Sequence, residues 1–281
     1  MLGKLIKKIR TSKGFTQAEI AKSAHISQSN YSKFEVDAIE IRATSFMMIL
    51  DKVGLDLEEF EFIKNGYSYS DKRKLLIKFF YAPYNSNLKL KEIYNECELI
   101  LNSRYDEDIK DIRTLCSALI HLNNDNDIEQ ARIPAFEIWD RLKKMEQLYI
   151  SDIYLFNAIM FIFPLETIME TRNFIQKSID RYKNFQNIDR MSINIILNLS
   201  YLYISNKKYS EALTEILNIE PKCKQLNAYI PLAICYIRKG ICMERTGSEE
   251  QGKQWIKKGL NIVEVLEEEK LLEALKLELT L

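Results

Sequence analysis

Glycine and proline are both scarce in this chain of 281 residues. It has eight glycines, none of them between Gly66 and Gly240, and five prolines. Proteins built from many tightly turned strands need more glycine than this, because turn positions with positive φ favour it. Apolar residues instead recur at helical spacing along most of the chain, for example at Leu213, Ile216 and Leu217. The sequence therefore predicts an all-α fold.

Histidine and cysteine patterns argue against metal sites and disulfides. Neither His25 nor His121 has a partner at metal-binding spacing, and the five cysteines include no C-x-x-C pair. We therefore expect no metal, and reduced, mostly buried thiols in a cytoplasmic protein. The chain also lacks an apolar run of about 18 residues that could span a membrane, and its start lacks the features of a signal peptide.

Signatures of catalysis are missing as well. No G-x-S-x-G motif or other catalytic constellation can be assembled from the sequence. Residues 247–254 nearly spell a phosphate-binding loop, but Gln254 stands where that loop needs Ser or Thr and no buried strand precedes it. We read this segment as a turn and the start of a helix, and we expect no enzyme activity and no cofactor.

Charge is balanced overall, with 40 basic and 40 acidic residues, but it is unevenly distributed. Residues 1–35 carry seven cations and only two anions, Glu19 and Glu35. A basic N-terminal segment on an acidic body suits a contact with nucleic-acid phosphate. An ordinary solvated helix face would have the same composition, so the charge alone leaves both readings open.

The strongest motif lies between Ile9 and Glu35. Gly14 ends one predicted helix, and Thr16 caps the next with Glu19 three residues later, which is the pattern of a capping box. After a short turn, Ser27 caps a third helix that runs to about Val36. Ile20, Ile26 and Phe34 are expected to point inward. The remaining polar residues at the start of the third helix are then free, as in a recognition helix that enters the major groove.

Each exposed position of this motif has a predicted role on DNA. Gln28 can pair with adenine, Gln17 can hold a phosphate at the start of the second helix, and Lys33 and Arg10 are expected to grip phosphate. A helical hairpin without a DNA role is the alternative. The predicted DNA-binding residues are Arg10, Thr16, Gln17, Ser27, Gln28, Ser29, Tyr31, Ser32 and Lys33.

A helical repeat follows. The segment from Asn198 through Tyr203 to Ala212 resembles the tetratricopeptide pattern, in which an aromatic residue packs helix A and a small residue lets helix B come close. Similar segments recur at steps of about 40 residues, and one step further back Lys91 breaks the pattern. The other predicted small positions are Ala131, Thr171 and Gly252. An irregular bundle with one chance match is the alternative.

These patterns predict three regions. Residues 1–64 form a helix-turn-helix domain of five short helices, residues 65–72 a polar linker, and residues 73–281 an α-solenoid of tetratricopeptide-like hairpins. The apolar segment from Leu271 to Leu281 is expected to cap the stack or to contact a second subunit.

The N-terminal motif resembles the XRE/Cro-repressor class of helix-turn-helix domains over residues 5–62. With the repeat behind it, the chain resembles the Rgg/MutR family of Gram-positive regulators. This resemblance implies a homodimer that binds double-stranded promoter DNA and a repeat domain that takes a short signalling peptide. Some relatives link their subunits by a disulfide beside the DNA-binding domain. Here the first cysteine is Cys97, so that link is not expected.

The resemblance also suggests where a peptide would bind, since the A helices of such stacks line the concave face. Asn194, Asn198 and Tyr201 fall on one side of a helix, and an asparagine amide can clamp a peptide backbone. Solvated surface positions, or amides that tie neighbouring repeats together, are the alternatives. The predicted peptide-binding residues are Asn157, Asn194, Asn198, Tyr201 and Arg238.

Three functions remain open at this point. The first is a peptide-controlled dimeric regulator of transcription. The second is a helix-turn-helix repressor whose repeat domain binds another protein or no ligand. The third is a structural adaptor that has lost DNA binding, which the presence of Gln17, Gln28 and Lys33 argues against.

Overall fold

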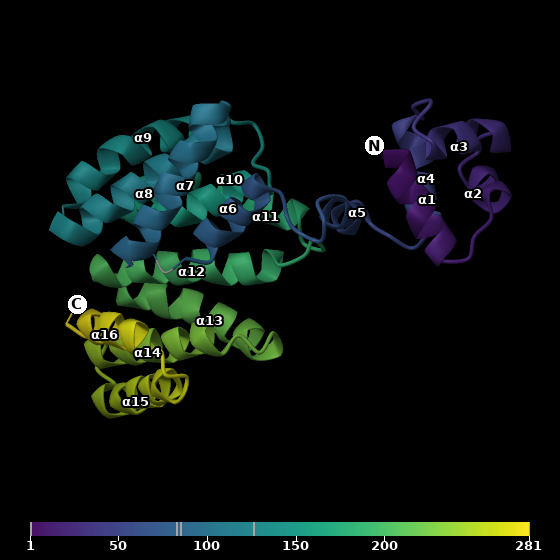
Figure 1. Ribbon diagram of the computed structural model, residues 1–281. Helices are drawn as coiled ribbons and strands as arrows, with labels where there is room; N and C mark the ends of the chain where they lie inside the picture. The colour runs from purple at the N-terminus through teal and green to yellow at the C-terminus, as the bar shows by residue number, and fades with distance from the viewer. Residues whose placement is uncertain (1, 83, 85, 126, 281) are drawn as a thin grey trace. The chain divides into compact units, whose positions relative to one another are not determined.

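The structure is a computed structural model that describes residues 2–82, 84, 86–125 and 127–280. Every regular element in those residues is a helix, so the predicted all-α fold is confirmed (Figure 1). The chain divides into two compact units, residues 1–78 and residues 79–281. The domain limits given above stay predictions, and Leu281, the last residue of the predicted cap, lies outside the described residues.

Five short helices make up most of the first unit. They are α1 (Leu2–Ser12), α2 (Gln17–Ser23), α3 (Gln28–Glu35), α4 (Ala43–Lys52) and α5 (Leu57–Lys64). Thr16 and Glu19 form the predicted capping box, in which the Glu19 carboxylate accepts the Thr16 N–H at 2.7 Å. The Ser27 hydroxyl accepts the Asn30 amide N–H at 3.2 Å and fixes the start of α3. The predicted helix boundaries around this motif are therefore confirmed.

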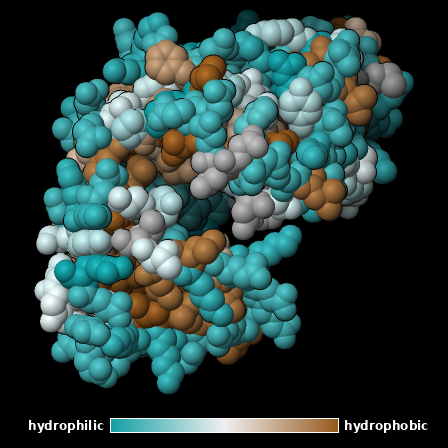
Figure 2. Space-filling model, turned by 90° about the vertical axis from the view of Figure 1, so that its left-hand side faces the viewer, coloured by the Kyte–Doolittle hydropathy of each residue, from teal (hydrophilic) through white to brown (hydrophobic). Residues whose placement is uncertain are grey.

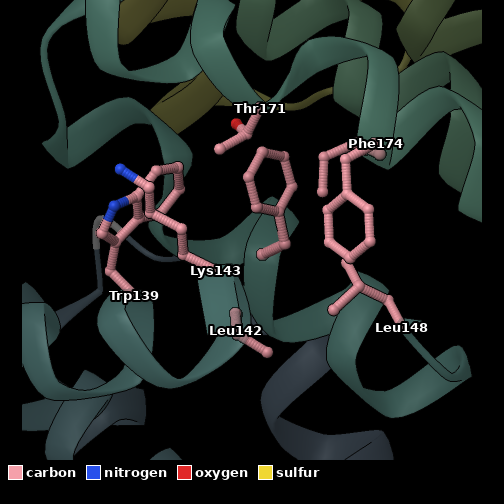
Figure 3. Close-up of a pocket in the computed structure, with 8 residues that line it drawn as sticks. Trp139, Leu142, Lys143, Leu148, Thr171 and Phe174 are labelled. Carbon is pink, nitrogen blue, oxygen red and sulfur yellow. The ribbon is translucent and has the colours of Figure 1, made fainter. Parts of the chain in front are cut away.

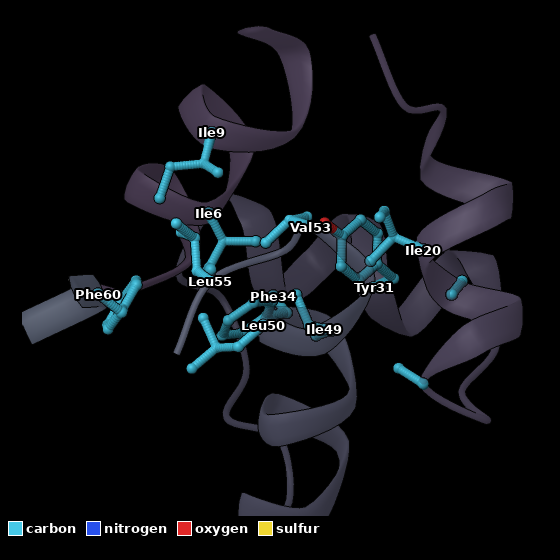
Figure 4. Packing of buried hydrophobic residues seen from close by; sticks show 12 residues of the cluster. Ile6, Ile9, Ile20, Tyr31, Phe34, Ile49, Leu50, Val53, Leu55 and Phe60 are labelled. Carbon is cyan, nitrogen blue, oxygen red and sulfur yellow. The ribbon is translucent and has the colours of Figure 1, made fainter. Parts of the chain in front are cut away.

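One hydrophobic cluster joins these helices (Figure 4). Ile6 of α1, Ile20 of α2 and Ile49 of α4 are fully buried in it. Helix α1 approaches α3 so closely that a Cβ atom on Gly3 would lie 1.7 Å from the carbonyl oxygen of Phe34. Only glycine fits at that position, and the first three helices therefore form a rigid support.

The second unit is a stack of antiparallel helices (Figure 1). The chain enters it at the end of α6 (Asp71–Phe80). The following elements are α7 (Asn87–Ser103), α8 (Glu107–Asp125), α9 (Ile128–Lys144), α10 (Ile150–Ile159), a 3-10 turn (Met160–Ile162), α11 (Leu165–Arg181), α12 (Ile188–Ser205), α13 (Tyr209–Gln225), α14 (Tyr229–Arg245), α15 (Glu249–Val265) and α16 (Glu269–Glu278).

The predicted hairpin repeat is present in this stack. Helices α8, α10, α12 and α14 take the A positions, and α12 contacts both α10 and α14 directly, so the A helices form one layer. Helices α9, α11, α13 and α15 take the B positions. The predicted small residues on these B helices are all buried: Ala131, Thr171, Ala212 and Gly252. Lys91, which breaks the pattern, is exposed on α7.

Three glycines bring α14 and α15 into close contact. A Cβ atom on Gly252 would lie 2.7 Å from the carbonyl oxygen of Gly240 and 2.5 Å from Cγ of Glu244. Gly259 lies equally close to the backbone of Ala233, where a Cβ atom would be 2.6 Å from the carbonyl oxygen. The close packing of α14 against α15 therefore requires glycine at these three positions.

The variant Gly252→Ala is expected to lower the stability of the repeat unit by about 1–2 kcal/mol. On an uncrowded helix the same change would stabilise by roughly 1 kcal/mol, so the sign of the effect reports the close approach. Thermal unfolding followed by tryptophan fluorescence would measure it, because Trp255 lies on α15. Gln254→Ala, at an exposed position of the same helix, should change stability by less than about 0.5 kcal/mol. A higher midpoint for Gly252→Ala would contradict the observed packing.

All five cysteines are buried and free, as predicted. No helix within the described residues is both long and apolar enough to cross a membrane. In the same residues, no three side chains of His, Cys, Asp or Glu come together as a metal site.

Candidate nucleic-acid interface and peptide-binding face

The start of α3 presents a polar edge to solvent. Gln28, Ser29 and Lys33 are exposed there and Ser32 is half-buried. Asn30 is exposed beside them, while Glu35, the one acidic residue of the helix, is buried. The exposed part of α3 therefore carries one positive charge, no negative charge and several neutral hydrogen-bonding groups, which suits contact with base edges and phosphates.

Tyr31 does not belong to this edge, and the prediction that it is free to reach DNA is wrong. Its side chain is 0% exposed in the core, with its ring centroid 6.2 Å from that of Phe34 (Figure 4). Burial raises the pKa of the Tyr31 hydroxyl well above its ordinary value. The reason is helical spacing: Tyr31 lies three residues before Phe34, on the inward side of α3.

Arg10 is also unavailable to phosphate, so that prediction is wrong too. The guanidinium is buried and donates to both carboxylate oxygens of Glu35, with Nε to Oε1 at 2.5 Å and Nη2 to Oε2 at 3.0 Å. A further hydrogen bond runs from Nη1 to the carbonyl oxygen of Phe15 at 2.7 Å. Arg10 therefore ties α1 to α3 and to the start of α2 instead of meeting DNA.

Gln17 completes the same network. Its Nε2 donates to Oε2 of Glu35 at 2.7 Å, so the Glu35 carboxylate on α3 accepts hydrogen bonds from side chains of both α1 and α2. Burial alone would raise the pKa of Glu35, but the hydrogen bonds from Arg10 and Gln17 outweigh it and hold that pKa below its ordinary value. Glu35 is the residue whose role the sequence analysis missed. The phosphate-binding role of Gln17 stays a prediction, as do the roles of Thr16 and Ser27.

On the repeat unit, the predicted peptide-binding residues do share one side of the A-helix layer. Asn198 of α12 donates from Nδ2 to the Asn157 carbonyl oxygen of α10 at 3.2 Å and to Asn157 Oδ1 at 3.1 Å. Asn194 is exposed one turn earlier on α12, and Tyr201 is half-buried one turn later. The Asn157–Asn198 pair therefore ties neighbouring repeats, the alternative left open above. A role for either residue in peptide binding stays a prediction.

Arg238 is the exception, and the prediction that it is available to a ligand is wrong in this structure. Its guanidinium is buried and bonds α12 through the carbonyl oxygen of Leu197 at 2.5 Å. It also bonds Glu278 of α16 at 2.8 Å and 2.7 Å. Its Cζ atom lies 5.5 Å from the ring centroid of Tyr201, over the ring. Arg238 therefore fastens the C-terminal helix to the A-helix layer.

An apolar pocket lies elsewhere in the stack, among α9, α10 and α11 (Figure 3). Trp139, Leu148 and Phe174 line it, with Lys143 and Thr171 as the polar members. Two of the three helices that surround it are B helices, so it is separate from the face that carries Asn194 and Asn198.

Comparison with known families agrees with this geometry. The family model described as "HTH-type transcriptional regulator Rgg, C-terminal domain" matches residues 90–277, about two thirds of the chain. A helix-turn-helix family model matches residues 6–60, which contain α2, α3 and most of α1.

Solved structures of the same fold cover the chain almost completely. A putative transcriptional regulator from Listeria monocytogenes EGD-e is 21% identical with a TM-score of 0.75, covering 99% of this chain and 96% of its own. Bacillus thuringiensis PlcR, solved with the peptide PapR7 and DNA, is 19% identical with a TM-score of 0.69, covering 98% of both chains. The Streptococcus dysgalactiae SHP pheromone receptor Rgg2 is 19% identical with a TM-score of 0.70, covering 100% of this chain and 99% of its own.

Proposed function

Because the chain belongs to the Rgg family of helix-turn-helix transcriptional regulators, we propose that it binds promoter DNA as a homodimer through α3, under the control of a short peptide. The observation that carries the proposal is the polar, acid-free edge of α3, held on a rigid support by the Glu35 network. In a dimer, two such helices would meet successive major grooves about 34 Å apart.

The A-helix face supports the peptide part of the proposal. The concave surface of a helical solenoid suits an extended ligand, and the exposed amide of Asn194 offers both a donor and an acceptor to a peptide backbone. Two proteins of the same fold are known with such partners: PlcR was solved with the peptide PapR7 and DNA, and Rgg2 is a pheromone receptor. We expect the peptide to act in the cytoplasm, where the promoter is.

Exposed apolar residues at the C-terminal end of the stack support the homodimer part of the proposal. Val265, Leu266 and Leu277 are exposed apolar residues at the end of α15 and on α16. Figure 2 shows apolar side chains gathered on the lower part of the molecule, where the C-terminal helices lie. Exposed apolar surface of this kind commonly marks an interface between proteins.

The test uses the full-length chain in a gel shift on DNA from upstream of its own gene. Specific binding over a scrambled fragment of equal length is expected, and its absence would reject the DNA-binding part of the proposal. An octapeptide selected from a random display library against the wild-type chain is then titrated by calorimetry and added to the shift. If selection yields no binder, or the peptide leaves DNA binding unchanged, the alternative of a repeat unit that binds another protein or no ligand is favoured.

The variant Asn194→Ala is expected to weaken binding of the selected octapeptide by about five- to tenfold, because an amide that bonds the peptide backbone is worth on the order of 1 kcal/mol. Calorimetry measures the change. Asn218→Ala, at an exposed position of the B helix α13, is the matched control and should leave the affinity unchanged. Equal affinities for wild type and Asn194→Ala would place the peptide away from this part of α12.

A further inference from the structure

The end of α6 carries two adjacent aromatic residues with different surroundings. Phe79 is fully buried, and its ring lies 5.4 Å from that of Tyr84. Phe80 is partly exposed, and its ring lies 4.6 Å from that of Tyr154 on α10, with an interplanar angle of 35°. Phe79 anchors the end of α6 inside the stack, whereas Phe80 lies against an A helix.

Tyr154 belongs to the A-helix side on which the peptide is proposed to bind. It precedes Asn157 by three residues, so both lie on the same side of α10. Asn157 is joined to Asn198 of α12, and Asn194 lies one turn from Asn198. The stacked pair of Phe80 and Tyr154 is therefore at the α10 end of a continuous row of side chains.

We infer that the ring of Tyr154 is a side-chain subsite of the groove, filled by Phe80 until a large apolar or aromatic residue of the peptide takes its place. The inference rests on the proposed function and adds to it a ligand preference and a means of control. The partner of Tyr154 can be replaced because Phe80 is partly exposed, and a peptide side chain of similar shape would make an equivalent stack.

Displacement of Phe80 by the peptide would affect the chain outside the groove, because Phe80 is the last residue of α6. Residues 65–70 and α6 are the covalent path from the helix-turn-helix to the stack. While Phe80 is stacked on Tyr154, the last turn of α6 is held by two aromatic contacts. When the peptide displaces it, the turn loses one of these two aromatic contacts, and that of Phe79 remains. Peptide binding therefore releases one end of the connecting helix, and it must first compete with the internal ring.

The variant Phe80→Ala is expected to bind the selected octapeptide about three- to tenfold more tightly than wild type, since the competing stack is gone. A fluorescently labelled form of that octapeptide, measured by polarisation on the full-length chain, gives the affinity. Tyr81→Ala is the matched control: Tyr81 follows Phe80, is 72% exposed, and its loss should leave the affinity unchanged. In a Tyr154→Ala background, the additional change Phe80→Ala should give no gain.

Hydrogen exchange of residues 71–80 supplies a readout that does not depend on affinity. The peptide is expected to speed exchange there in wild type, and Phe80→Ala should exchange fast without peptide. Wild-type and Phe80→Ala chains that bind the octapeptide equally well would overturn the subsite while leaving peptide control intact. If no octapeptide binds wild type, the proposed peptide control fails and the subsite fails with it. A Phe80→Ala chain whose tryptophan fluorescence shows unfolding is replaced by Phe80→Leu, for which a smaller gain in the same direction is expected.

Discussion

Replacing Arg10 with methionine is expected to destabilise the N-terminal unit by about 3 kcal/mol. Methionine keeps much of the apolar stem but removes the guanidinium that faces Glu35, whose side chain is completely buried. The carboxylate then keeps the hydrogen bond from Gln17 but loses its compensating charge. Breaking one side of a buried ion pair costs more than the pair contributes, because an unpaired charge stays inside.

Hydrogen exchange can measure this loss in the full-length chain. Amides of α1, α2 and α3 should exchange faster in Arg10→Met, whereas tryptophan fluorescence should report an unchanged second unit, since both tryptophans, Trp139 and Trp255, lie there. Lys8→Met, at an exposed position of α1, is the matched control and should change little. Adding Glu35→Leu to Arg10→Met should recover much of the lost stability. Unchanged exchange in Arg10→Met would show that the ion pair contributes nothing.

Acid provides a second check on the same pair. The pKa of Glu35 is lowered in the folded chain, so the stability that it contributes is present above its unfolded value of about 4.5 and is lost as pH falls through the folded pKa. Without Arg10, burial raises the pKa of Glu35, so the difference between wild type and Arg10→Met should be largest near neutral pH and should shrink on acidification, as Glu35 protonates in the variant before it does in wild type. A difference that grows on acidification would contradict the lowered pKa.

Replacing Gln28 with alanine is expected to weaken specific promoter binding by about 10- to 100-fold, because a bidentate contact with a base contributes roughly 1–3 kcal/mol of discrimination. Gln28 is the first residue of α3 and is exposed, so its loss leaves the core of the unit intact. Fluorescence anisotropy on the upstream fragment measures the change. Binding to a scrambled fragment should fall much less, since non-specific binding comes from phosphate contacts.

Lys33→Ala gives the matched contrast on the same helix. Lys33 is exposed, so we expect it to contact phosphate. Its removal should weaken binding to both fragments about equally and should reduce the slope of log affinity against log salt concentration by about one. Gln28→Ala should leave the salt dependence unchanged. If Gln28→Ala bound the promoter as tightly and as selectively as wild type, α3 would not be the helix that reads sequence.

Local signals in the sequence were sufficient for the fold. Caps at Thr16 and Ser27 fixed helix boundaries because each cap involves residues only three positions apart. The step of about 40 residues located the small positions of the B helices, since every repeat solves the same packing problem. Apolar periodicity was enough to predict helices, because helical contacts along one chain are local.

The errors at the candidate site come from partners far away in the sequence. Arg10 pairs with a residue 25 positions later and Arg238 with one 40 positions later, and no local pattern reveals such a pair. Charge favoured an exposed position for both, although Arg10 lies four residues after the buried Ile6, on the inward side of α1. The error at Tyr31 is different, because the signal that would have corrected it was local. Its hydroxyl suggested an exposed position, but its spacing of three residues from Phe34 places its side chain in the core.

The shared carboxylate of Glu35 has a consequence for how such a switch can evolve. Arg10 of α1 and Gln17 of α2 both bond the buried carboxylate of Glu35 on α3. Small movements of these helices would break that network, so changes inside the helix-turn-helix are poorly tolerated. Inherited changes in responsiveness would then accumulate in the tether and the solenoid. Homologues with different repeat domains would then bind different peptides while recognising the same DNA sequence.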